Sequence, residues 1–337
     1  MTRVDWARIA ASVRREQERM IWRPYGAPDI LDLERTSFHD AAVSERWDLS
    51  EKLIVSVAVT GAFFRKAQNP HQPITPDEIR ASAAEVAAGA STIHVHVRDD
   101  RGYNALSYER FAEVVRPLRA QFPQLAVDGC LVPALPGEWR EMQRVLASGL
   151  LDAAPLNATA THVGDSLFAK PAAVLMEKAR LVVEHGLAPE IAVYTDADVS
   201  NADRFLLRSG VVATPAVWLV LPALPGCMPM DNPRQMAEGL LRVTGTIRDV
   251  DPGAVILVCA AGRASMLLAT LAASLGLHIR VGMEDTYWLW PHRDDRLESN
   301  AQALSVARAI SSATGRPIAS HAEYRALTGI APRAVAR

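Results

Sequence analysis

From residue 53 onward the chain alternates short apolar runs with longer amphipathic segments, and it does so eight times. Short runs rich in β-branched residues predict buried strands, and the 3.6-residue spacing of the longer segments predicts helices. The predicted strands are 53–60, 92–97, 126–130, 153–156, 190–194, 216–221, 254–258 and 279–281. The predicted helices are 76–88, 108–120, 138–148, 171–184, 201–208, 233–248, 265–274 and 298–314.

Parallel strands joined by helical crossovers are the structure that eight strand-then-helix units favour. Most of the runs are apolar on both faces, which suits a buried parallel sheet. We therefore predict an α/β fold, a (β/α)8 TIM barrel over residues 51–337. A doubly wound open sheet is the alternative, but no Gly-x-Gly-x-x-Gly pattern follows the first predicted strand.

Residues 1–50 have a different character from the rest of the chain. Residues 4–22 form an arginine-rich amphipathic pattern, which predicts a helix, and an irregular stretch with Pro24, Gly26 and Pro28 follows. We interpret this part as an N-terminal helical extension that packs on the barrel or on a neighbouring subunit. The alternative is a cover for the active site of another chain.

Two histidines, His94 and His96, stand two residues apart inside one of the predicted strands. Side chains alternate between the faces of a strand, so both imidazoles point the same way. Two parallel imidazoles near the end of a strand are half of a metal site. The alternative is a pair of hydrogen-bonded polar residues in the core.

Polar residues also follow other predicted strands, at the end of a barrel where active sites lie. The first and last strands of a closed barrel are neighbours, so Glu284 can approach His94 and His96. Two imidazoles and one carboxylate leave positions open on a zinc ion, as catalytic zinc sites do. Iron, nickel or cobalt would also accept these ligands.

Two arginines lie near the same end of the predicted barrel. Arg263 follows a glycine at a helix start, where a carboxylate or phosphate would also meet backbone N–H groups. Arg280 lies on the last strand and needs a carboxylate partner, for which Asp285 is close in sequence.

The composition indicates a protein whose partners are small molecules. The formal net charge is −2, and the charged residues are mixed along the chain, so we expect neither nucleic acid nor a membrane surface as a partner. Three separated cysteines without a Cys-x-x-Cys pair predict a reduced, cytoplasmic protein. We find no signal-peptide pattern and no apolar run of about 18 residues, the length that a membrane-spanning helix needs.

Over about residues 53–330 the sequence resembles the β-keto acid cleavage enzyme family. The most specific matching stretch is Ser-Thr-Ile-His-Val-His-Val-Arg-Asp at 91–99, and the last strand matches at 280–285. The other matching stretches are 59–62, 69–70, 73–79, 88–90, 156–157, 164–165, 262–263 and 299–301.

This resemblance implies an activity and roles for particular residues. It implies a TIM barrel with zinc held by His94, His96 and Glu284, and a general base, Asp285, oriented by Arg280. It implies that a β-keto acid and acetyl-CoA, the co-substrate, give acetoacetate and a new acyl-CoA. It also implies a homo-oligomer, a dimer or a tetramer.

The chain departs from the family pattern around the expected substrate. Phe63 stands where a glutamate follows Thr-Gly-Ala, and Cys130 begins the stretch that replaces Ser-Thr-Gly-Gly. Pro155 replaces a threonine, and Ala192 replaces a fifth-strand glutamate. A buried ammonium needs a counter-charge, so these changes argue against an amino-bearing substrate. The residues that we expect to contact substrate are Thr60, Phe63, Cys130, Asn157 and Arg263.

Two other classes of function remain as alternatives. A metal-dependent hydrolase would also use His-x-His on a strand, but such barrels need further histidines on the fifth and sixth strands, and 190–194 and 216–221 contain none. A non-catalytic protein that binds acyl-CoA or a metal is the second, suggested by Phe63 and Pro155.

Overall fold

A computed structural model describes residues 4–18, 46–223 and 232–331. The chain divides into two compact units, Met1–Leu49 and Ser50–Arg337. The described helix of the first unit is α1 (Trp6–Glu18). The rest of the helix predicted over 4–22 lies outside the described residues, and the role of the extension stays a prediction.

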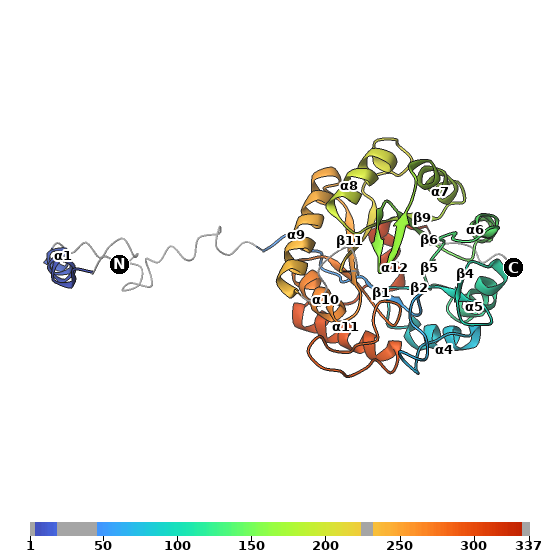
Figure 1. The fold of residues 1–337 in the computed structure, drawn as a ribbon, viewed down its shortest axis with the longest axis horizontal. Coiled ribbons are helices and arrows are strands. Elements are labelled where there is room, and N and C mark those ends of the chain that lie inside the picture. The colour runs from blue at the N-terminus through green and yellow to red at the C-terminus, as the bar shows by residue number, and fades with distance from the viewer. Residues whose placement is uncertain (1–3, 19–45, 224–231, 332–337) are drawn as a thin grey trace. The chain divides into compact units, whose positions relative to one another are not determined.

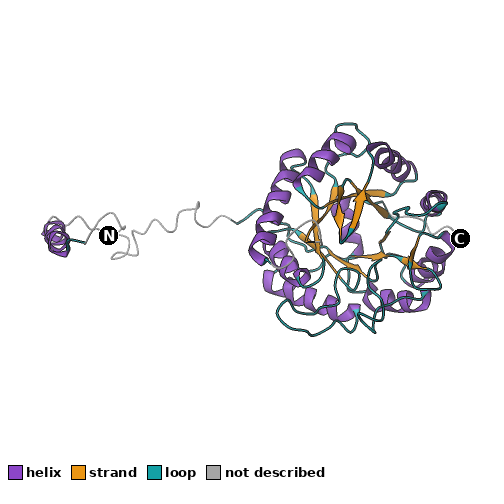
Figure 2. Cartoon of the chain, in the orientation of Figure 1, coloured by secondary structure: helices purple, strands orange, loops and turns teal. Residues whose placement is uncertain are grey.

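The second unit is built on a closed barrel of eight parallel strands with helices around it (Figures 1 and 2). The strands lie in the order β1-β12-β11-β10-β9-β6-β5-β2, so the first and last strands are hydrogen-bonded neighbours. Their bounds are β1 (Val55–Ala58), β2 (Thr92–Val95), β5 (Val127–Gly129), β6 (Ala153–Asn157), β9 (Ala188–Val193), β10 (Val217–Ala223), β11 (Val255–Ala260) and β12 (His278–Val281). The predicted TIM barrel is confirmed.

The helices follow the predicted segments with one difference. The fifth helix was predicted from residue 201, but α8 (Asp196–Ala202) begins earlier and continues as a π-helix, Asp203–Leu207. Its start is set by Thr195, which forms a capping box with Asp198. The others are α4 (Pro76–Ala87), α5 (Tyr108–Gln121), α6 (Glu138–Ala147), α7 (Ala172–Glu184), α9 (Pro233–Val250), α10 (Ala264–Ser274) and α11 (Asn300–Thr314). None of the described helices is both long and apolar enough to cross a membrane.

Five short elements were not predicted. Two small antiparallel pairs lie beyond the carboxyl ends of the strands: β3 (Val97–Arg98) with β4 (Asn104–Ala105), and β7 (Ala160–Val163) with β8 (Ser166–Ala169). A last helix, α12 (His321–Thr328), lies across the middle of the barrel in Figure 1. Its Tyr324 belongs to one buried cluster with Ile54 and Ala126 at the starts of their strands, so α12 closes the amino end of the barrel.

His278, at the start of β12, gives this end of the barrel a pH-dependent stability. Its Nδ1 accepts a hydrogen bond from the Ile54 N–H at 3.1 Å, and burial, with Arg316 and Arg248 nearby, lowers its pKa to about 3. The folded chain therefore holds the neutral ring, and the stability that this provides is present above pH 6.5 and is lost as pH falls.

We expect the wild type to lose about 1 kcal/mol of unfolding free energy relative to His278→Asn between pH 6.5 and about 5.5. Asparagine keeps an acceptor for Ile54 but does not titrate. Urea unfolding of both proteins at the two pH values measures the difference. An equal change in unfolding free energy for both proteins between the two pH values would show that His278 does not control stability in acid.

Candidate metal centre

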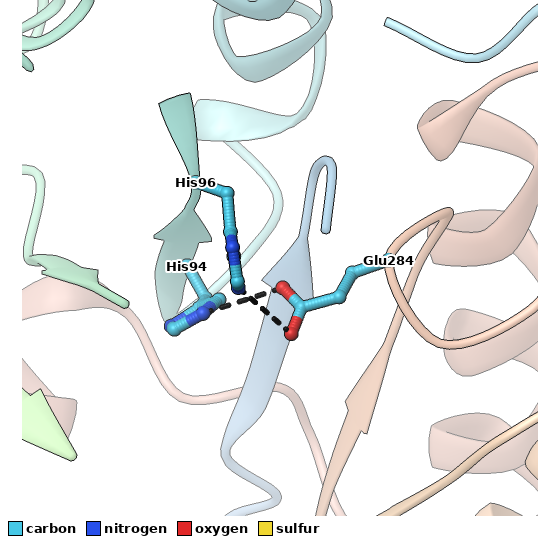
Figure 3. A group of neighbouring side chains, drawn as sticks. All are labelled: His94, His96 and Glu284. Atoms are coloured by element: carbon cyan, nitrogen blue, oxygen red, sulfur yellow. Dashed lines mark ion pairs between the residues drawn. The ribbon is translucent and has the colours of Figure 1, made fainter. Parts of the chain in front are cut away.

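Three side chains converge at the carboxyl end of the barrel: His94, His96 and Glu284 (Figure 3). His94 Nε2 lies 3.3 Å from Glu284 Oε2, and His96 Nε2 lies 3.3 Å from Glu284 Oε1. One ligand atom from each residue lies within 4.8 Å of the others. The histidines come from β2 and the residue that follows it, and Glu284 comes from the loop after β12, so the closure of the barrel brings them together.

Two glycines allow the close packing around Glu284, Gly61 against its side chain and Gly282 against the backbone of Ala58. A Cβ on Gly61 would lie 2.4 Å from Glu284 Cγ. Gly282 has φ +138°, and a Cβ there would lie 2.3 Å from the carbonyl oxygen of Ala58. That same carbonyl accepts a hydrogen bond from the Glu284 N–H at 3.1 Å. The close approach of the two backbones therefore fixes Glu284 against the end of β1.

Both histidines are oriented through Nδ1, which leaves Nε2 for a metal. Asp128 of β5 hydrogen-bonds to His94 Nδ1, and Asn104 Oδ1 lies 2.7 Å from His96 Nδ1. Such partners fix the tautomer and the ring orientation of metal-binding histidines. Neither was predicted as a site residue, although a lone acid inside the apolar run 126–130 was a signal for Asp128.

Arg280 joins the glutamate to the neighbouring aspartate. Its Nη2 donates to Glu284 Oε1 at 2.6 Å and to Asp285 Oδ1 at 2.7 Å, and its Nε donates to Asp285 Oδ2 at 3.1 Å. Burial raises the pKa of Asp285, although the Arg280 guanidinium opposes this rise. Burial also works against ionisation of Glu284, but the charges of Arg280 and His94 outweigh it and lower the Glu284 pKa.

The geometry fits a divalent transition metal. Glu284 Oε2 is a buried carboxylate oxygen without a hydrogen-bond partner. Leaving such an atom unpaired in the interior is unfavourable, and a cation between it and the two Nε2 atoms would remove the penalty. Two imidazole nitrogens and one carboxylate oxygen also match the ligand types of open zinc sites.

Three of the expected substrate residues lie at or just after the carboxyl ends of barrel strands. Thr60 is fully buried and donates to the Pro73 carbonyl at 2.8 Å, so its hydroxyl supports a loop. Burial raises the pKa of the Cys130 thiol, but the charge of nearby His96 outweighs burial and lowers that pKa to about 7. Asn157 Nδ2 donates to the Tyr194 hydroxyl at 3.1 Å, and its Oδ1 is buried without a partner.

The other two expected substrate residues are more exposed. The Phe63 side chain is 66% exposed. Arg263 packs over the Trp288 ring at 3.9 Å, pairs with Asp294 and donates to the Arg293 carbonyl at 2.5 Å. The guanidinium of Arg263 already has partners, and its contact with a substrate anion stays a prediction.

A buried acid that was not predicted lies on β9. Glu190 is two residues before Ala192 and shares its face of the strand. Burial, together with the charge of Asp128, raises its pKa to about 7. Glu190 therefore adds a titratable group beside His94 and Asp128 within the barrel.

Comparison with known proteins identifies the family of this chain. A model of the beta-keto acid cleavage enzyme family matches residues 52–330. The chain belongs to this family. A 3-keto-5-aminohexanoate cleavage enzyme from Acetoanaerobium sticklandii is 28% identical over 287 residues, which cover 83% of this chain and 99% of the relative.

Other members of the β-keto acid cleavage enzyme family carry different substrate names. A 3-oxoadipate:acetyl-CoA acetyltransferase from Cupriavidus necator is 28% identical and is matched over 84% of this chain and 96% of its own length. Among solved structures, the complex of ObcA with oxaloacetate has a TM-score of 0.67 at 19% identity, over 77% of this chain and 68% of that one. At this identity the structural likeness supports the barrel fold alone.

The role of Gly61 in this family member can be tested by adding one methyl group. We expect Gly61→Ala to lower metal affinity by roughly tenfold or more, because its Cβ would displace a ligand side chain. Gly245→Ala is the matched control, since a Cβ there meets nothing within 4 Å. Competition with a chromogenic chelator measures the affinity. Equal affinities in the two variants would mean that Glu284 is not a ligand.

Asp128 should support the metal through His94 without binding it. We expect Asp128→Asn to weaken metal binding by about 10–100-fold, because the amide supports His94 less strongly than a carboxylate does. The same chelator competition measures this effect. An unchanged affinity would mean that Asp128 has only a structural role.

Proposed function

We propose that this chain catalyses an acetyl exchange in which a β-keto acid and acetyl-CoA give acetoacetate and a new acyl-CoA. Its metal is a divalent transition metal held by His94, His96 and Glu284, with zinc as the first choice. The observation that carries the proposal is this cluster, with the unpartnered Glu284 Oε2 inside it and Asp285 beside it. Zinc, when bound, would act as a Lewis acid toward the carbonyl and carboxylate oxygens of the keto acid.

The chain's own residues would handle the proton. Asp285 accepts a proton from the carbon between the two carbonyl groups of the substrate, and Arg280 holds the carboxylate in place through two hydrogen bonds. That carbon then bonds to the acetyl carbonyl carbon, and the CoA thiolate leaves. The thiolate next attacks the original keto carbon. The bond between that keto carbon and the carbon that lost the proton then breaks, and Asp285 returns its proton to the latter carbon. The products are acetoacetate and the new acyl-CoA.

The names of the relatives support this reaction class and leave the substrate open. One is named for 3-oxoadipate and acetyl-CoA, and another for 3-dehydrocarnitine and acetyl-CoA. Because Ala192 stands in place of a glutamate, we propose a β-keto acid without an amino group. We also propose a homodimer or homotetramer, which light scattering after size-exclusion chromatography measures directly.

Turnover of a panel of β-keto acids by the metal-loaded protein tests the proposed function. We expect acetoacetate to form only when acetyl-CoA is present. A metal-dependent hydrolase would release product without acetyl-CoA, and a non-catalytic binding protein would release none. A tenfold or greater preference for 3-keto-5-aminohexanoate over an unsubstituted acid of equal length would contradict the proposed specificity.

A further inference from the structure

A small cavity lies near the carboxyl ends of β5 and β6. It has a volume of about 50 Å³. This is a few times the roughly 10–15 Å³ that one water molecule needs, which suits a group the size of a carboxylate. Its lining combines apolar walls with an amide and two amino groups: Pro133, Trp139, Leu175, Asn157, Lys170 and Lys178.

The segment that follows β5 connects the cavity lining to the candidate metal centre. Lys178 Nζ donates to the carbonyl oxygens of Leu131 at 2.5 Å and Pro155 at 2.7 Å, so it lies between the ends of the two strands. Leu131 directly follows Cys130, whose backbone N–H donates at 3.1 Å to the carbonyl oxygen of Val95, the residue between His94 and His96. A substrate held at the metal by one end could therefore reach the cavity with its other end.

Two lysine amino groups line this cavity without an acid from the described residues beside them. Lys178 is only 6% exposed, yet within the described residues no carboxylate lies within 4 Å of either Lys170 or Lys178. Among the other buried cations, Arg119 pairs with Asp152 and Arg280 pairs with Asp285. Arg98 and Arg316 are instead held, like Lys178, by backbone carbonyls. Bonds to two backbone carbonyls explain how Lys178 is held in place, but they supply no counter-charge.

We infer that the cavity binds a carboxylate at the far end of the β-keto acid substrate, and this inference rests on the proposed function. The ammonium of Lys178 has a third N–H to donate, and Lys170 adds a second positive charge. Asn157 contributes an amide with one free atom, Oδ1. Since the Tyr194 hydroxyl can bond with either amide atom, a flipped Asn157 presents its NH2 group to an anion. The apolar walls contact the methylene groups between the two ends.

A pair of six-carbon substrates tests this inference on the metal-loaded protein. The acids 3-oxoadipate and 3-oxohexanoate differ in whether the far end is a carboxylate or a methyl group. We expect the wild type to prefer the dicarboxylate in kcat/KM by tenfold or more. Lys178→Met and Lys170→Met should each lower kcat/KM for the dicarboxylate by about 10–100-fold and leave that for 3-oxohexanoate within about twofold. Lys52→Met, which loses a pair with Glu323 instead, is the control.

Other results would overturn the inference. A wild-type preference for 3-oxohexanoate, or an equal loss for both acids in both variants, would make the lysines structural. If the lysine variants raise the KM for acetyl-CoA and keep the wild-type preference between the two acids, the lysines bind CoA and not the substrate carboxylate. If the wild type turns over no β-keto acid of the wider panel, the proposed function fails. Calorimetric titration of both acids into the metal-loaded protein tests the cavity independently of turnover. Tighter binding of the dicarboxylate that is lost in the lysine variants supports the role of the cavity, and equal binding of the two acids contradicts it.

Discussion

Asp285→Asn is expected to lower turnover by a factor on the order of 10²–10⁴ while the metal stays bound. Asparagine keeps the shape of the side chain and can still hydrogen-bond, but it cannot accept the substrate proton. The wild-type carboxylate is buried and is held by two hydrogen bonds from Arg280, so its position for that transfer is fixed. Measuring kcat together with metal content by elemental analysis separates loss of the base from loss of the metal.

The control for this variant is Asp77→Asn, which changes an exposed acid paired with Arg80 on α4. That substitution should leave both turnover and metal content unchanged. If Asp285→Asn loses its metal, Asp285 supports the ligands and is not the base. If the variant keeps both metal and full turnover, another group accepts the proton.

His94→Ala is expected to remove most of the bound metal. The substitution leaves two ligands, His96 and Glu284, where zinc sites of this kind use three. It also leaves the Asp128 carboxylate buried without its imidazole partner. Elemental analysis after dialysis against a weak chelator measures metal content per chain.

A second buried histidine provides the matched control for His94→Ala. His278 lies at the opposite end of the barrel, and His278→Asn should keep its metal in full. Full metal content in His94→Ala would contradict the proposed ligand set. A loss in both variants would point to general unfolding, which the thermal midpoints of the two variants would reveal.

The fold and the clustering of His94, His96 and Glu284 could be predicted because each depends on a pattern within the sequence or on the closure of the barrel. The alternation of apolar runs located all eight strands, and β12 pairs with β1 as a closed barrel requires. The two-residue spacing of His94 and His96 put both rings on one face, and barrel closure placed Glu284 opposite them.

The residues that were not predicted depend on contacts between distant segments. Asn104 reaches His96 only because β3 and β4 pair beyond the end of the barrel strand. Lys178 lies within a helix whose amphipathic pattern does not distinguish a lysine buried against strand ends from one in solvent. Arg263 was expected to meet an anion, and its pair with Asp294 comes from a loop about 30 residues further along the chain.

The most direct test of the proposed acetyl exchange follows the two acetyl carbons of acetyl-CoA. The metal-loaded enzyme is given an unlabelled β-keto acid and acetyl-CoA that carries ¹³C at both acetyl carbons, and the products are examined by NMR. We expect the label at carbons 3 and 4 of acetoacetate and none in the acyl group of the new thioester. Unlabelled acetoacetate, or label that remains in the thioester, would contradict the proposed acetyl exchange.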